Sequence, residues 1–147
     1  MKKLLKSLLA VMLIAMMAFS FTSCGVAKKP EKAEKKLEKA GYEVEIIDDE
    51  AALAYYTERY DLEKGDIECI LEAEKDSDFV TIIYCANRKA AKKIYDETKK
   101  TFDEMKEEIK KLSGTEKELA EEYLDKLDYG KSGKVVYSGT KKGVKAA

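Results

Sequence analysis

The 147-residue chain contains no histidine, no tryptophan and only one proline. The absence of histidine excludes imidazole acid/base catalysis, imidazole-dependent catalytic triads and histidine metal ligands. Arginine is scarce as well, since only Arg59 and Arg88 occur among 28 basic residues. With 29 acidic residues the net charge is −1, so the basic surplus that nucleic-acid binding requires is missing. We therefore expect no nucleic-acid partner.

The N-terminal segment has the order of an export signal. Three lysines and no acid occupy residues 1–6, and the 15 residues of 7–21 (SLLAVMLIAMMAFSF) carry no charge. Thr22 and Ser23 then precede Cys24. This order predicts a secretory signal peptide over residues 1–23. The uncharged run is shorter than the roughly 20 apolar residues that a membrane-spanning helix needs.

The residues just before and at Cys24 (FTSC) resemble the lipobox of bacterial lipoproteins, in which a lipidated cysteine becomes the new N-terminus. Gly25 agrees with that pattern, whereas Phe21 departs from it because leucine is usual there. The resemblance implies a diacylglycerol thioether on Cys24, detectable by palmitate labelling, and two acyl chains anchor a protein stably. We therefore expect membrane lipid as the partner of Cys24, on the extracytoplasmic face of the cell membrane. An ordinary signal peptide and an uncleaved anchor are the alternatives.

Cleavage before Cys24 leaves 25 basic and 29 acidic residues, a net charge of −4. We expect residues 24–29 to form the lipidated cysteine and a short tether, and residues 30–147 to form a single α+β domain. In its layout this mature chain resembles small, uncharacterised lipoproteins of anaerobic Gram-positive bacteria. That resemblance implies no activity.

The spacing of apolar residues predicts the elements of the domain. Helices are expected over residues 30–40, 49–60, 88–112 and 115–127, and strands over 42–46, 66–74, 79–86 and 135–137. The middle two strands form a hairpin. Without the first helix, the order matches the split βαβ arrangement of ferredoxin-like folds. We therefore predict a four-stranded antiparallel sheet of ferredoxin-like order, preceded by an extra N-terminal helix.

Apolar alternation within the hairpin predicts its register. A turn centred between residues 76 and 77 places Cys69 opposite Tyr84, and Cys85 opposite Glu68. The two cysteines then point to opposite faces of the sheet. A shift by one residue would bring them together but would mix apolar and acidic side chains on both faces. We therefore predict no disulfide, and two free, buried thiols.

Acidic clusters are the first candidates for a site. Residues 48–50 (DDE) offer the oxygen ligands that a hard cation prefers, but acids here also begin a helix, and we favour that interpretation. Residues 76–78 (DSD) resemble the start of a calcium loop but lack its glycine and its distant glutamate, which favours a turn. The chain has no glycine-rich phosphate loop and no serine elbow. We therefore expect neither a metal nor a cofactor.

Tyrosine and lysine are the other candidates for recognition. Tyr55, Tyr56 and Tyr60 fall on one predicted helix and suggest a binding surface, although half-buried tyrosine is also common in protein cores. Residues 28–39 carry six lysines and three glutamates, a local net charge of +3. Close to an anionic bilayer such lysines attract headgroups. The alternative is an ordinary solvated helix face.

These observations predict a membrane-tethered, non-catalytic binding or interaction module whose ligand is an unidentified protein or small molecule. Two other classes are weighed against it. A carboxylate-based envelope hydrolase would need an acid whose pKa is raised by apolar surroundings, and the sequence indicates none. A structural or protease-modulating envelope domain is neither supported nor excluded.

Overall fold

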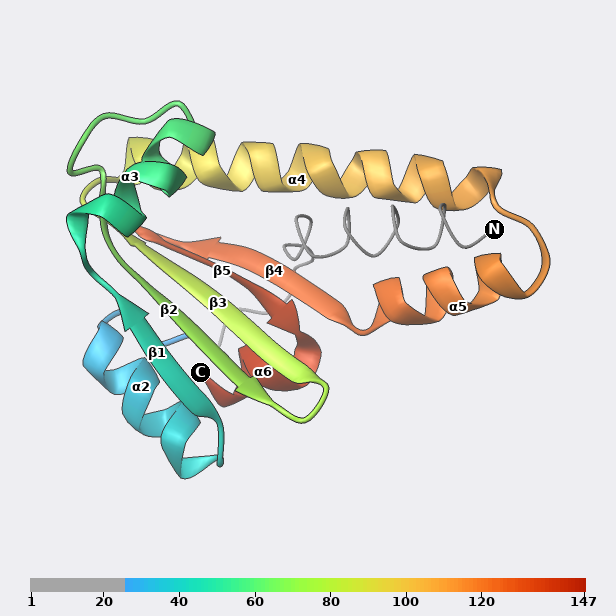
Figure 1. Ribbon diagram of the computed structural model, residues 1–147, viewed down its shortest axis with the longest axis horizontal. Coiled ribbons are helices and arrows are strands. Elements are labelled where there is room, and N and C mark those ends of the chain that lie inside the picture. The colour runs from blue at the N-terminus through green and yellow to red at the C-terminus, as the bar shows by residue number, and fades with distance from the viewer. Residues whose placement is uncertain (1–25) are drawn as a thin grey trace.

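A computed structural model describes residues 26–147 (Figure 1). The signal peptide predicted over residues 1–23 and the predicted lipidation site Cys24 lie outside these residues. No helix in the described part of the chain is long and apolar enough to cross a membrane. The elements are, in order, α2 (Pro30–Lys39), β1 (Glu43–Ile47), α3 (Glu50–Arg59), β2 (Ile67–Lys75), β3 (Asp78–Cys85), α4 (Arg88–Lys111), α5 (Gly114–Asp125), β4 (Leu127–Ser132), β5 (Val135–Thr140) and α6 (Lys141–Ala146).

The strands form one antiparallel sheet in the order β1-β2-β3-β5-β4, which confirms the α+β class. Two details of the prediction are wrong. The sheet has five strands in the described residues rather than four, and its order is not the split βαβ order. A split βαβ unit leaves a gap between the strands that each helix connects. Here the ten-residue α3 turns the chain at the end of the sheet, so that β2 pairs directly with β1 (Figure 1).

The strand absent from the prediction is β4, at one edge of the sheet. Its sequence (LDYGKS) ends a helix and begins a loop in the sequence interpretation, whereas in the structure it pairs with β5. Gly130 lies opposite Tyr137, and a Cβ atom at Gly130 would lie 2.4 Å from the Tyr137 hydroxyl oxygen. The tyrosine ring therefore occupies the space over this glycine and supplies packing that the β4 sequence lacks.

The β2–β3 hairpin confirms the predicted register from Glu74, opposite Phe79, to Cys69, opposite Tyr84. The open end differs. The register shifts between Ile67 and Cys69, so Ile67 lies opposite Cys85. This irregularity places Ile67 and Cys85 together on one face and leaves Cys69 on the other.

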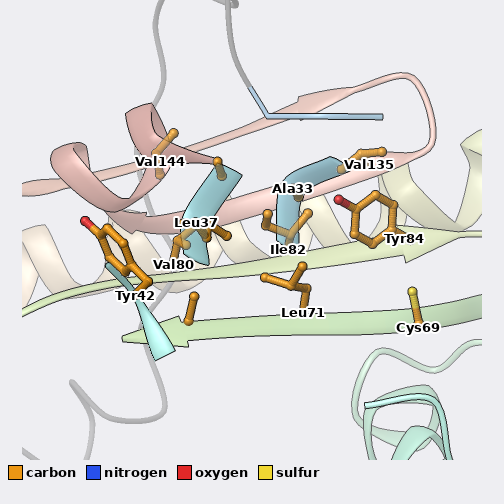
Figure 2. Packing of buried hydrophobic residues seen from close by; sticks show 12 residues of the cluster. Ala33, Leu37, Tyr42, Cys69, Leu71, Val80, Ile82, Tyr84, Val135 and Val144 are labelled. Atoms are coloured by element: carbon orange, nitrogen blue, oxygen red, sulfur yellow. The ribbon is translucent and has the colours of Figure 1, made fainter. Parts of the chain in front are cut away.

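Helices cover both faces of the sheet. α2 and α6 lie on one face, where Leu37 and Val144 belong to the same buried cluster as Leu71 and Ile82 (Figure 2). α3 and the first turns of α4 lie on the other face, over a cluster that includes Ile70, Ile83 and Ile94. Farther along α4, Phe102 and Met105 pack against Leu127 and Tyr129 of β4. The long apolar stripe of α4 is therefore buried within a single chain.

The C-terminal helix α6 is held closely against the start of β3. The Thr140 side chain caps it by accepting a hydrogen bond from the Gly143 amide, at 3.1 Å. At its far end, the Ala147 carbonyl accepts a hydrogen bond of 3.3 Å from the Ala27 amide. Ala27, near the start of the described chain, therefore lies beside Ala147 at its end.

Candidate functional site

Two of the acidic residues singled out in the sequence, Asp49 and Asp76, have structural roles. Asp49 is the N-cap of α3, and its side chain accepts hydrogen bonds from the amides of Ala51 and Ala52, at 3.1 and 2.9 Å. Asp76 lies in the β2–β3 turn with a φ of 54°. Among the residues that the structure describes, no group of three or more acids or cysteines could hold a metal ion. The cap and turn interpretations are therefore the ones that the geometry shows.

The tyrosines of α3 divide between core and surface. Tyr60 is buried, and this burial raises the pKa of its hydroxyl to about 12. Tyr56 is half-buried, and its ring meets that of Tyr55 edge-on at 5.4 Å. Tyr55 itself is 64% exposed. The three residues thus do not form one continuous aromatic surface, because only Tyr55 is largely exposed.

A surface cavity of about 740 Å³ lies between α3 and the segment that leads into β2. We call it the α3 groove. Five apolar residues line it, and four charged residues accompany them, of which Lys64 forms an exposed ion pair with Glu50. The apolar residues are Ala51, Leu53, Ala54, Leu62 and Ile67, and the charged ones are Asp48, Glu50, Glu58 and Lys64.

The volume of the α3 groove is that of a small-molecule site, because such sites span roughly 300–1,000 Å³. Three carboxylates against one ammonium group favour a ligand that has an apolar body and a positive charge. The Thr57 hydroxyl at the groove donates a 2.7 Å hydrogen bond to the Leu53 carbonyl. The groove therefore offers apolar and charged surfaces for binding, whereas the Thr57 hydroxyl is already used in a hydrogen bond within α3.

Sequence reasoning missed this groove. It identified residues 48–50 as a helix start, but the other wall comes from residues 62–67, which it assigned to a turn and a strand. A second depression, of about 680 Å³, follows charged residues of α4. α4 is its only wall among the described residues. One helix does not enclose a ligand, so the α3 groove is the better candidate.

Glu72 is a carboxylate in an unusual position. It lies directly opposite Glu45 on the neighbouring strand, and the Tyr56 hydroxyl donates a 3.3 Å hydrogen bond to its Oε1. Partial burial raises the pKa of Glu72, and the hydrogen bond from Tyr56 opposes this shift, while Glu45 and Glu74 add to it. The expectation that no acid has a pKa raised by its surroundings is therefore wrong, and burial also raises the pKa of Asp128.

The two cysteines of the hairpin are buried and free, on opposite faces of the sheet. Burial raises the pKa of the Cys69 thiol to about 11 and that of the Cys85 thiol to about 12. Because the thiolate is the reactive form, thiols with such pKa values are poor nucleophiles near neutral pH. Both side chains act as small apolar groups in their clusters.

No family model matches the sequence, and no match was found among curated proteins or solved structures. The interpretation of the chain therefore rests on its residues and their geometry.

Proposed function

We propose that the chain is a lipoprotein, exported and held on the extracytoplasmic face of the cell membrane by a diacylglycerol group on Cys24. Its folded domain works there as a non-catalytic binding module. The observation that carries this proposal is the order of basic segment, uncharged run and cysteine in residues 1–24.

The start of the described chain supports a short tether. Ala27 is already part of the domain, since its amide donates a hydrogen bond to Ala147 and its carbonyl accepts one of 3.0 Å from the Tyr84 hydroxyl. Only residues 25 and 26 separate Cys24 from this point. A lipid on Cys24 would therefore hold the domain against the bilayer rather than far above it.

The α3 groove supports the binding role. Its lining is apolar with an acidic rim, and a protein segment or small molecule with apolar and basic groups fits that chemistry. A carboxylate-based hydrolase is the second candidate, because Glu72 has a raised pKa, as a general acid requires. Glu72 is not among the residues that line the α3 groove, however, which favours binding over hydrolysis.

Metabolic labelling with palmitate tests the anchor. We expect the label in the wild-type protein and not in Cys24→Ala, which should leave the membrane fraction or keep its signal peptide. Cys69→Ala is the matched control, since it removes a cysteine from the folded domain and should keep the label. Equal labelling of Cys24→Ala and the wild type would contradict the proposal.

A further inference from the structure

Helices α2 and α6 come from opposite ends of the described chain and lie together on one face of the sheet (Figure 1). Both helices, and the two residues that precede α2, expose lysines. We call these nine exposed lysines the basic layer: Lys28, Lys29, Lys32, Lys35, Lys36, Lys39, Lys141, Lys142 and Lys145. The sequence indicates the α2 part of this layer, but only the fold brings α6 beside it.

The charges on α2 are sorted into separate stripes. Ala33 and Leu37 face the sheet, and lysines 32, 35 and 39 follow one another along the helix at three- and four-residue spacing. Residues at these spacings share one side of a helix. By the same rule glutamates 31, 34 and 38 share another side. The lysine stripe is therefore continuous along the helix.

The fold separates charge across the molecule. The nine lysines and the three glutamates of α2 give this side a net charge of +6, although the described residues together carry −4. The rest of the domain therefore carries −10. The Asp78 Oδ2 atom lies 3.4 Å from the Lys142 Nζ atom and offsets one positive charge of the basic layer. The layer still keeps a large excess of positive charge.

We propose that the basic layer contacts the anionic phospholipid headgroups of the bilayer and fixes the orientation of the domain on the membrane. This inference rests on the proposed function, since the tether enters the domain at Ala27, beside α6. Lysines are mobile point charges, which suits attraction to a fluid charged surface better than bidentate recognition of one group. The anionic bilayer surface repels the rest of the domain, which carries a net negative charge. Attraction of the basic layer and repulsion of the rest therefore favour the orientation in which α2 and α6 face the bilayer.

The test uses residues 25–147 without an acyl chain. The described residues within this range form the five-stranded sheet and three apolar clusters on its two faces, so they carry a core of their own. Vesicles of phosphatidylcholine alone are compared with vesicles that also contain phosphatidylglycerol. We expect binding to the anionic vesicles at about 10 mM salt, where the Debye length is about 30 Å, and its loss at about 1 M salt, where that length is about 3 Å.

Two variants with equal total charge locate the contact. The first replaces two lysines of each basic-layer helix by glutamine: Lys32, Lys35, Lys141 and Lys145. The matched control replaces four exposed lysines of α4, which lies on the other face of the sheet: Lys99, Lys100, Lys110 and Lys111. Each lysine near an anionic surface strengthens binding by about fivefold at low salt. We expect the first variant to bind at least about 100-fold more weakly than the wild type, and the control to bind less than about tenfold more weakly.

Two results would overturn the inference: no binding of the wild-type protein to anionic vesicles at low salt, or an equal loss in both variants. Binding to soluble polyphosphate without binding to vesicles would overturn it as well. Because residues 25–147 lack Cys24, these outcomes do not depend on lipidation. Failure of the palmitate test with retained vesicle binding would refute the anchor and leave the basic layer supported.

Discussion

Replacing Gly143 by alanine tests how α6 is docked on the sheet. A Cβ atom at this position would lie 2.2 Å from the carbonyl oxygen of Phe79 and 2.7 Å from its carbon. Ordinary contact begins near 3.4 Å, so α6 would have to move by about 1.2 Å. Both obstructing atoms are backbone atoms of β3, and they cannot rotate away as a side chain could.

The energetic balance favours destabilisation. Alanine in place of glycine gains about 1 kcal/mol of helix propensity. Against this, overpacking in a closely packed interior costs about 1–3 kcal/mol. Lifting α6 also weakens the burial of Val144 and the hydrogen bond between Thr140 and Gly143. We expect the free energy of unfolding to fall by about 1–3 kcal/mol in total.

Urea denaturation followed by circular dichroism measures this change. With a slope of about 1–3 kcal/mol per molar urea, the midpoint should fall by about 1 M. Lys145→Ala is the control, since it alters an exposed position of the same helix and should change stability by less than about 0.5 kcal/mol. A Gly143→Ala protein as stable as the wild type would refute the reasoning, because it would mean that α6 does not rest on the Phe79 carbonyl.

Two further predictions concern titratable groups, the partly buried Glu72 and the two buried thiols. Because the folded state raises the pKa of Glu72, its carboxylate destabilises the fold above that pKa, and the effect disappears below the ordinary pKa of glutamate. In urea denaturation at pH 7, Glu72→Gln should therefore have a free energy of unfolding about 0.2–1 kcal/mol higher than that of the wild type, and this difference should vanish near pH 3. An equal gain in the exposed control Glu118→Gln would contradict this. For the thiols, a colorimetric count at pH 8 on unreduced protein of residues 25–147 should find Cys69 and Cys85 unreactive while folded and both reactive in denaturant. A count of zero in denatured monomer would show a disulfide.

The hairpin is the part of the fold that the sequence predicts best. On one face of the hairpin an apolar residue occupies every second position of both strands, and burial of that face permits one register from Cys69 to Glu74. The irregularity at its open end was not predictable in this way. Ile67 and Ile70 are three positions apart and lie on the same face of the sheet, so the alternation of side chains between the two faces is interrupted between them. The burial of both residues depends on α3 and α4, which cover that face.

The edge strand and the strand order depend on contacts that sequence patterns do not contain. β4 has two apolar residues, Leu127 and Tyr129, and the ring of Tyr137 from β5 covers Gly130. The position of β5 beside β3 brings together residues more than 50 positions apart, such as Ile83 and Val136. Local periodicity predicts that strands exist, whereas their neighbours are decided by packing of the complete chain.

The candidate surfaces show the same division. The lysines of α2 and the acids at the start of α3 are evident from sequence. The α3 groove needs Leu53 and Leu62 on opposite walls, and the basic layer needs Lys141 and Lys145 beside α2. Each surface combines segments whose proximity only the tertiary fold establishes.

The hydrogen bond between Ala27 and Ala147 makes this domain suitable for circular permutation. A short linker could join the two positions, and new ends could be opened between Leu112 and Gly114, at the turn between α4 and α5 (Figure 1). A lipid attachment sequence placed at the new N-terminus would tether an otherwise unchanged fold from the far end of α4. Such a permutant would point the lysines of α2 and α6 away from the lipid, and would thereby separate attachment to a membrane from orientation on it.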